Sequence, residues 1–535
     1  MTTIAATPID FSSLPQADLA DDGGRALDAR LLVTDEIAAA VAQAVGQGFA
    51  VMPAGGLTSA IGSFDYAAEA AAAFAGVVAI RPKGALEADI VDSATPPERL
   101  KSNQVAIDAE RGLVAAGAGL TVAQVNAALA AKVGPTAQVL VDLTSVASAF
   151  VGGVVATGAM GPLRQRPSVV LEAVVLADGG EPKLISGDGI GAVEGMQGWT
   201  GMVAAAVFRF YHLPPGEFGL VLPIQGTDVD TMAGLLSYLE KWTRIELPEP
   251  GGRIDGAEAV LNGVELVSRD SLAAFIDEAQ DPARSKAEGL LQSCEYAGAD
   301  MLACLTGWSE QSVDDVLFAL MDPETETIGG VMIEYGVGFS SGAEMDTFRA
   351  IREGAPDLAR TRARVKPPGR LKPWTTSTDI NVAAPADSGP ISDILSAYAD
   401  YRVAIRSLGK ELAGTVDVEL AAYGHLSPRG IDPHHRVTLF ADEGQEAALA
   451  AARQAVAASK RALIRDLLHA AERGGAAITG GEKGTPSLVE IARAAGGANR
   501  LPDVLKTRFR LAREAVAAAP ANFSFRAPAE LREAE

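Results

Sequence analysis

Cysteine is almost absent from this chain of 535 residues, which has only Cys294 and Cys304. Two thiols without neighbouring ligands exclude a cysteine-ligated zinc site, an iron–sulfur cluster and a disulfide framework. A single bridge between Cys294 and Cys304 is the one pairing that the sequence leaves open.

Long apolar runs and basic residues are also scarce. No uncharged apolar run reaches 18 residues, so we expect no membrane-spanning helix. The acidic N-terminus lacks the basic start of a secretory signal. The expected compartment is therefore cytoplasmic, with peripheral membrane association left open. Lysine and arginine number 45 against 68 acidic residues, a net charge of -23, which argues against nucleic acid as a partner.

What the chain does contain is a mixture of short β-rich runs, glycine-rich turns and alanine-rich helical stretches, which predicts an α+β fold. We expect a polar lead-in (1–30), a first domain (31–215), an α+β cap or substrate domain (216–444) and a C-terminal helical segment (445–535). Pro214 and Pro215 mark the first boundary, because proline continues neither helix nor strand well. Within the cap, the composition predicts a strand over Gly330–Phe339, and further on a turn over Gly474–Thr485.

A glycine-rich loop follows the apolar strand predicted over Phe49–Pro53. Its sequence from Pro53 to Gly62 is PAGGLTSAIG. Adjacent glycines let consecutive backbone N–H groups converge on an anion, and Thr58 and Ser59 add hydroxyl donors. The loop has neither the lysine of a Walker motif nor the GxGxxG spacing of a Rossmann fingerprint. An anion-binding loop and a plain tight turn both stay open.

A second segment is built almost wholly from small residues and hydroxyls. Val141–Pro162 reads VDLTSVASAFVGGVVATGAMGP, and such small side chains let a large planar ligand approach the backbone closely. Close packing of helix on strand explains some of the glycines but not the density of threonine and serine. A third glycine-rich element, Glu194–Val203, leads into an apolar strand.

Taken in this order, with VAIDAERGLVAAGAG (Val105–Gly119) and VVLADG (Val174–Gly179) at the expected places, these segments resemble the FAD-binding domain of the vanillyl-alcohol oxidase/p-cresol methylhydroxylase superfamily. The resemblance covers about Leu31–Pro215 and implies a two-part FAD-binding domain. It further implies that the first loop cradles the FAD pyrophosphate, the second lies along the isoalloxazine and ribityl chain, and the Gly201–Val203 backbone meets the adenine. One departure is Leu163–Pro167 (LRQRP), where the family usually continues towards Arg-Tyr-Gly.

The resemblance implies a set of FAD-contacting residues in these three segments. They are Pro53, Ala54, Gly55, Gly56, Leu57, Thr58, Ser59, Ile61, Gly62, Asp142, Thr144, Ser145, Ser148, Gly152, Gly153, Ala156, Thr157, Gly158, Gly161, Gly201, Met202 and Val203. No histidine or cysteine precedes His212, so the covalent links that some relatives make from these loops have no donor here. We therefore expect FAD to be bound non-covalently.

Histidine is scarce as well, yet three of the five histidines, His425, His434 and His435, fall within eleven residues. Imidazole is a common ligand of borderline divalent metals, and a chain folding back between two strands could bring these residues together. A solvated polar hairpin without a metal is the alternative.

With the later Thr479–Thr485 (TGGEKGT), this cluster resembles the C-terminal region of FAD-linked oxidases: D-lactate dehydrogenases, glycolate oxidase flavin subunits and D-2-hydroxyglutarate dehydrogenases. FRAIRE from Phe348 and DINVAAP from Asp379 extend the likeness. It implies a divalent metal, Zn or Mn, bound by His425, by His434 or His435, and by Glu482. It also implies Arg352 as a partner of the substrate carboxylate, with a salt bridge between Arg352 and Glu353 as the alternative.

The chain departs from that family at several of these positions. Lys483 stands where relatives have a catalytic histidine, Ser427–Asp432 replaces their Gly-Asp-Gly-Asn turn, and Asn522–Arg526 replaces a late Asn-Pro-Gly-Lys. Lys483 could act as a base with a lowered pKa, or bind a substrate carboxylate. Loss of the metal is a third alternative.

The expected activity is FAD-dependent oxidation of a 2-hydroxy acid resembling D-lactate or glycolate, by hydride transfer to flavin N5. The alternatives are a metal-free flavin oxidase or dehydrogenase of another alcohol or a phenol, and a flavoprotein electron-transfer subunit of a larger complex. With no iron–sulfur ligands of its own, the chain would pass electrons to O2, a quinone, a cytochrome or a partner subunit. A homo-oligomer and a complex subunit are both left open.

Overall fold

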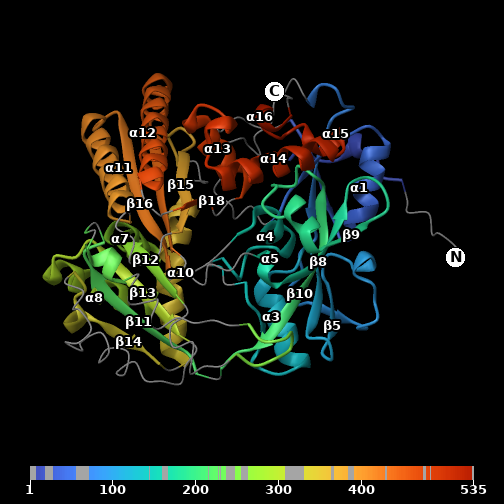
Figure 1. Ribbon diagram of the computed structural model, residues 1–535, viewed down its shortest axis with the longest axis horizontal. Helices are drawn as coiled ribbons and strands as arrows, with labels where there is room; N and C mark the ends of the chain where they lie inside the picture. Colours follow the sequence, from blue (N-terminus) through green and yellow to red (C-terminus); the bar gives the residue numbers. More distant parts are fainter. Residues whose placement is uncertain are drawn as a thin grey trace.

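The computed structural model describes residues 8–17, 28–55, 71–141, 143, 145–159, 167–214, 216–226, 228, 230–235, 247–254, 263–307, 330–340, 342–362, 367–383, 391–427, 430–473, 477–481 and 484–532. Three β-sheets organise this part of the chain, two formed by the N-terminal half and one by the C-terminal half. Figure 1 shows the two halves side by side, with the last helices extending across from one to the other. The expected α+β fold is confirmed.

The first sheet has three parallel strands in the order β1-β3-β2. They are β1 (Arg30–Thr34), β2 (Ala50–Pro53) and β3 (Val77–Pro82), and helix α1 (Ile37–Gly46) connects the first two. β2 is apolar and almost fully buried, so the chain leaves the core at Pro53, where the first glycine-rich loop begins.

The second sheet is largely antiparallel and follows the order β4-β5-β6-β10-β8-β9, with β7 also paired to β10. Its strands are β4 (Asp89–Val91), β5 (Gln104–Asp108), β6 (Leu113–Gly117), β7 (Ala137–Val139), β8 (Leu171–Ala177), β9 (Lys183–Ser186) and β10 (Met202–His212). The central β6 and β10 are continuous apolar runs rich in alanine and valine, a pattern that fits strands buried on both faces.

Three helices accompany the second sheet: α3 (Val122–Lys132), α4 (Val151–Thr157) and α5 (Pro167–Val170). A capping box starts α3, since the Thr121 hydroxyl accepts the Gln124 backbone N–H while the Gln124 side chain accepts the Thr121 N–H. The glycine at position 158 ends α4 in a left-handed conformation.

The third sheet has eight strands in the order β14-β11-β13-β12-β16-β17-β15-β18. They are β11 (Phe218–Ile224), β12 (Gly263–Ser268), β13 (Met301–Gly307), β14 (Val337–Phe339), β15 (Trp374–Ala383), β16 (Val416–Ser427), β17 (Gly430–Ala441) and β18 (Ala477–Gly481). Helices α7 (Arg269–Glu278), α8 (Ala283–Ala297) and α10 (Gly342–Arg362) share one core with β11, β12 and β13. Helices α11 (Ile391–Glu411) and α12 (Glu446–Arg473) share the other core with β16 and β17.

The C-terminal helices are α13 (Thr485–Ala495), α14 (Asp503–Ala518), α15 (Ala521–Ser524) and α16 (Ala529–Arg532). They lie between the third sheet and the first (Figure 1). Phe523 of α15 is fully buried in the core around α1, and the Asn522 side chain donates to the Phe49 carbonyl at 2.7 Å. The chain end therefore packs into the N-terminal half.

Two expected elements are wrong. The strand predicted over Gly330–Phe339 is limited to β14, because a 3₁₀ turn at Ile333–Tyr335 and the close approach of Gly336 to Leu222 interrupt it. The turn predicted over Gly474–Thr485 contains the edge strand β18, which pairs with β15 despite its two glycines. The lead-in predicted over 1–30 also takes part in the fold, since Phe11 is fully buried and β1 begins at Arg30.

Candidate functional site

The three small-residue segments converge at one place in the N-terminal half. A Cβ built on Gly55 would lie 3.7 Å from Gly153 Cα, and one built on Gly198 would lie 2.8 Å from the Pro53 ring. The first loop, helix α4 and the turn before β10 are therefore in mutual contact, although some 150 residues separate the first from the last.

Backbone hydrogen bonds fix α4 in this position. The N–H groups of Val151 and Gly152 donate to Leu120 and Ala118 at 2.7 and 3.1 Å. The N–H of Gln197 donates to the Ala156 carbonyl at 2.8 Å. Around Gly153, in contrast, no atom of the described residues outside the helix itself lies within 4 Å of the place where a side chain would begin. Open space beside a fixed helical backbone is what a large planar cofactor needs, so these residues fit FAD.

Thirteen of the predicted FAD residues lie in the described part of this region. They are Pro53, Ala54, Gly55, Ser145, Ser148, Gly152, Gly153, Ala156, Thr157, Gly158, Gly201, Met202 and Val203. The remaining nine lie outside the described residues: Gly56, Leu57, Thr58, Ser59, Ile61, Gly62, Asp142, Thr144 and Gly161. Met202 and Val203 belong to β10 and pair with β8. The contact of each residue with FAD stays a prediction.

A fourth segment reaches the same place from the far end of the chain. Gly484 has a φ of +67°, and a Cβ there would lie 2.6 Å from Gly195 Cα. The next residue, Thr485, donates its N–H to the Gly195 carbonyl at 3.0 Å. The predicted site residues Glu482 and Lys483 directly precede this contact and lie outside the described residues.

The histidine cluster lies on β16 and β17. In their antiparallel register His425 is opposite Asp432, and Tyr423 is opposite His434. Because side chains alternate along a strand, these four residues share one face of the sheet. His425, Asp432 and His434 each offer a ligand atom, and these atoms all lie within 4.8 Å of one another.

His435 lies on the opposite face of the sheet. Its ring stacks on Tyr398 of α11 at 5.3 Å, and burial keeps the pKa of this imidazole well below its usual value. The sequence left His434 and His435 as alternatives for the second metal ligand. The structure places His434 beside His425, with 5.3 Å between ring centroids, and separates His435 from both. The expectation of a solvated hairpin is wrong, since all three histidines are buried.

Two further polar side chains support the cluster. Oε2 of the fully buried Glu265, on β12, lies 2.7 Å from His425 Nδ1. In the amide orientation that satisfies both groups, with oxygen and nitrogen exchanged, the Asn381 NH2 group donates to Asp432 Oδ2 at 2.8 Å. Buried carboxylates need compensating positive charge. The imidazoles of His425 and His434 and the carboxylate of Asp432 form a donor set that fits Zn²⁺ or Mn²⁺. Glu265 is the second carboxylate that orients one of these imidazoles.

Two buried arginines, one on the sheet and one on a neighbouring helix, accompany the histidine cluster. Arg436 continues the row of Asp432 and His434 along β17 and donates to the Tyr423 hydroxyl at 3.2 Å. The predicted carboxylate partner Arg352 lies on α10, is 7% exposed, and donates to Glu353 at 2.9 Å. The salt bridge with Glu353, expected as the alternative to binding a substrate carboxylate, is therefore present, and Arg352 is buried.

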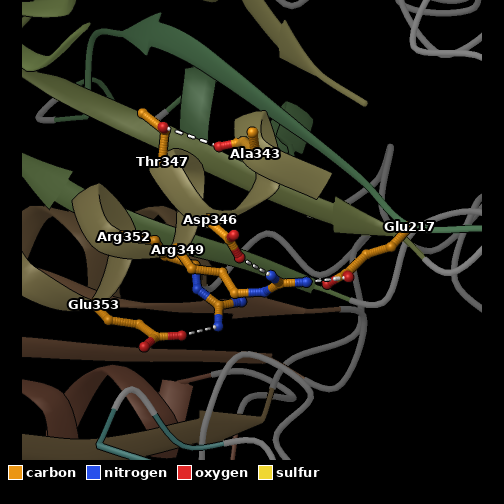
Figure 2. Close-up of polar contacts among 7 residues, drawn as sticks. All are labelled: Glu217, Ala343, Asp346, Thr347, Arg349, Arg352 and Glu353. Atoms are coloured by element: carbon orange, nitrogen blue, oxygen red, sulfur yellow. Dashed lines mark hydrogen bonds and ion pairs between the residues drawn. The ribbon is translucent and has the colours of Figure 1, made fainter. Parts of the chain in front are cut away.

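Figure 2 shows how α10 presents these groups. Arg349, one turn before Glu353, forms ion pairs with Glu217 and with Asp346, the latter at 3.0 Å, and is half-exposed. Arg352 points from the same helix toward Glu353 (Figure 2). Two of these charges act on the buried Cys304 thiol of β13: Glu265 raises the pKa of this thiol, and Arg352 lowers it. Arg352 and Glu265 are therefore close enough to act on one atom.

Sequence reasoning missed Glu265, Asp432 and Arg436 as site residues. Asp432 and Arg436 alternate with His434 at a period of two, which marks them as one face of a strand. Glu265 is the lone acid of an apolar run, GVELVS, and an acid in such a run is a signal of a buried polar contact.

Comparison with known proteins now adds to this geometry. Residues 99–183 match the family model described as FAD binding domain. The matched range runs from before β5 through α3 and α4 to the start of β9, so it includes the second small-residue segment. No protein of curated function matches the chain.

Solved structures resemble the chain over most of its length. The 4-ethylphenol oxidase from Gulosibacter chungangensis, in its isoeugenol complex, matches with a TM-score of 0.54 and 14% identity, over 92% of this chain and 87% of that one. Alkyldihydroxyacetonephosphate synthase in one crystal form matches with a TM-score of 0.54 and 10% identity, over 80% of this chain and 70% of that one. Another crystal form gives a TM-score of 0.52 and 9% identity, over 83% and 77%. At such identities the likeness concerns the fold.

The chain shares its fold with these solved structures, and its residues 99–183 match an FAD binding domain.

The second small-residue segment lies within the matched FAD binding range, and the histidine cluster lies on the third sheet. The match to an FAD binding domain supports FAD as the cofactor of this chain. Among the helices that the structure describes, none is long and apolar enough to cross a membrane.

Proposed function

We propose that this protein is an FAD-dependent dehydrogenase that oxidises the CH–OH group of a 2-hydroxy acid. The observation that carries the proposal is the buried group of His425, Asp432 and His434, whose ligand atoms lie within 4.8 Å of one another. Hydride transfer to FAD is by itself compatible with many classes of substrate. A buried metal-ligand set with two arginines near it favours an anionic substrate that chelates through oxygen.

In the proposed site, His425, Asp432 and His434 hold one divalent metal, with Glu482 as a further ligand. A bound metal of this kind orients the hydroxyl and carboxylate oxygens and lowers the pKa of the hydroxyl. Glu265 fixes the tautomer and orientation of His425 through their 2.7 Å contact. Asn381 holds Asp432 in place by donating to its carboxylate.

The substrate carboxylate is bound by a guanidinium, because this fork of N–H donors matches two carboxylate oxygens. Arg352 and Arg436 are the residues proposed for this role, and both are buried. Lys483 is the proposed base for the hydroxyl proton. It would need a lowered pKa, which burial or a nearby cation supplies.

FAD, when bound, accepts the hydride removed from the α-carbon. The chain's part is to hold it: Pro53–Gly55 and α4 contact each other, and Gly153 borders open space. The acceptor that reoxidises the flavin is proposed to be O2, a quinone, a cytochrome or a partner subunit. Steady-state assays with each acceptor would choose among them.

The substrate class is tested by mixing the FAD-loaded protein with a panel of D-2-hydroxy acids without oxygen. We expect at least one member to bleach the visible flavin absorbance, and matching 2-hydroxy acids blocked at the carboxylate to fail. If no member reduces the flavin while dithionite does, the substrate assignment is wrong.

The metal assignment is tested by replacing His434 with alanine. We expect His434→Ala to lose the divalent metal and at least a hundredfold of kcat/KM, while FAD stays bound. His469→Ala is the matched control, because His469 is exposed and pairs with Glu472 at the surface. Equal metal content in both variants would contradict the assignment.

A metal-free oxidation of a phenol is the second proposal, favoured by the fold likeness to a 4-ethylphenol oxidase over 92% of the chain. It predicts a purified protein with full activity on a phenol and no stoichiometric metal. Elemental analysis of the native protein, with the chelator-treated protein assayed beside it, separates the two proposals.

A further inference from the structure

The face of the third sheet that is turned away from His434 has a pocket of its own. It holds about 460 Å³ of empty space, part of it open to solvent. Helix α11 covers it on one side, and Gly226 and Asp228, which follow β11, border it on another. Its lining also includes His425 and Tyr423, so the pocket borders the proposed metal site, but it includes neither Asp432 nor His434.

His435 contributes polar atoms to this pocket. Its side chain is 2% exposed, and neither ring nitrogen has a hydrogen-bond partner in the described part of the chain. Its ring is held in place by stacking on Tyr398 and by an edge contact with Tyr401 at 5.9 Å. A buried imidazole carries at least one N–H, and leaving such a donor unsatisfied is costly.

Arg402 of α11 contributes a cation. It is 7% exposed, and its Nε has no acceptor among the described residues. Among the described residues, its two terminal nitrogens make only long contacts, 3.8 Å to Met301 Sδ and 3.4 Å to the Gly226 carbonyl. Such distances exceed the range of a strong hydrogen bond, so the guanidinium has donor capacity to spare.

Other charged groups near Arg402 do not use this capacity. Asp300 lies close enough to affect the Arg402 pKa, but its buried Oδ1 makes no hydrogen bond within the described residues. Arg406, one turn later on α11, is exposed. Asp228 at the rim already accepts the N–H and hydroxyl of Thr231 at 2.8 and 2.6 Å.

The remaining lining is apolar and includes Met232, Leu266, Leu395 and Ile431. We propose that the pocket binds a small aliphatic monocarboxylate, with its carboxylate on Arg402 and His435 and its chain against these side chains. A concave, mostly apolar site with a few convergent donors is typical of small-molecule binding. The carboxylate supplies the acceptors that the buried donors lack.

The test is calorimetric titration of the full-length, FAD-loaded protein with sodium pentanoate, 1-pentanol and inorganic phosphate. We expect saturable binding of pentanoate, with pentanol and phosphate each at least tenfold weaker. Absence of saturable pentanoate binding overturns the proposal, since water then fills the pocket. Equal binding of pentanol, or equal binding of phosphate, overturns the assignment to a monocarboxylate.

Three variants locate the binding. Arg402→Met should weaken pentanoate at least tenfold, whereas Arg406→Met, the same change on the exposed turn of the same helix, should change it less than twofold. Arg436→Met, on the opposite face, should also leave pentanoate binding intact. Loss in Arg436→Met would place the ligand in the proposed active site and overturn the proposal. Should Arg402→Met fail to retain FAD, the three-ligand comparison and Arg436→Met decide by themselves.

Discussion

Single side chains decide how the histidine cluster is oriented, and Glu265 is the clearest case. It is a fully buried carboxylate in an apolar strand, with Oε2 2.7 Å from His425 Nδ1. A carboxylate in this place determines which ring nitrogen carries the proton and leaves the other nitrogen to a metal. Glu265 is therefore a positioning residue.

Replacing Glu265 with glutamine removes the charge and keeps the shape. We expect the affinity for the divalent metal to fall by about 10- to 100-fold, the usual effect of losing such a partner. Competition with a chromophoric chelator measures this affinity. Glu295→Gln is the control, because Glu295 forms a surface pair with Arg269. An unchanged affinity in Glu265→Gln would exclude the positioning role.

The two cysteines are a second feature at the residue scale. Cys294 and Cys304 are both free and buried, and burial raises the pKa of each thiol to about 12. The bridge that the sequence left open is therefore not formed. Because the thiolate is the reactive form, both residues should be inert in the folded protein.

We accordingly expect no reaction of the native protein with Ellman's reagent at pH 8 over minutes. After denaturation both thiols should titrate. A native thiol that reacts at the rate of free cysteine, or a total below two after unfolding, would contradict this description of the core.

Among the elements, the contact between Gly484 and Gly195 joins the start of α13 to the small-residue segments. Gly484 has positive φ and no room for a Cβ, whereas a Cβ built on Gly414, with a φ of +86°, meets no atom of the described residues within 4 Å. Alanine at either position meets the backbone strain of a positive φ, on the order of 1–3 kcal/mol. Only at position 484 would the added methyl group also push apart the backbones of residues 484 and 195.

Gly484→Ala should therefore lower the melting temperature more than Gly414→Ala and should weaken FAD retention, which Gly414→Ala should leave unchanged. Thermal unfolding and the flavin content after gel filtration measure both effects. If the two variants lose the same stability and hold FAD equally well, the contact does not support the cofactor site.

Elements with strong local signals could be predicted from the sequence. The sequence predicts strands over Gly112–Ala116 and Val203–Tyr211 and a helix over Thr121–Ala131, and β6, β10 and α3 lie within one residue of these bounds. The edge strand β18 could not be predicted, because its hydrogen bonds come from β15, about a hundred residues earlier. The strand predicted over Gly330–Phe339 is mostly absent from the structure. Its apolar run suits a strand, but close contacts with β11 interrupt it.

The candidate site shows the same division. The FAD segments and the histidine cluster could be located because each is contiguous in sequence. Which histidine pairs with His425 depended on the register of β16 with β17, and Glu265 enters only through the neighbouring strand. Register and strand order are long-range properties that a local pattern does not determine.

At the scale of the whole molecule, the chain end returns to its beginning. Asn522 bonds the Phe49 carbonyl, Phe523 fills the core around α1, and Arg526 donates to the Gln197 carbonyl at 3.1 Å. The C-terminal helices thus connect the half that carries the histidine cluster with the half that carries the FAD segments (Figure 1). Binding of FAD should depend on both halves.

The most direct measurement is the flavin content of the purified full-length protein before and after acid precipitation. We expect a yellow protein that releases one FAD per chain into the supernatant, because the glycine-rich segments meet in one place and offer no histidine or cysteine for a covalent link. A colourless protein that does not take up added FAD, or flavin that stays with the precipitated chain, would contradict it.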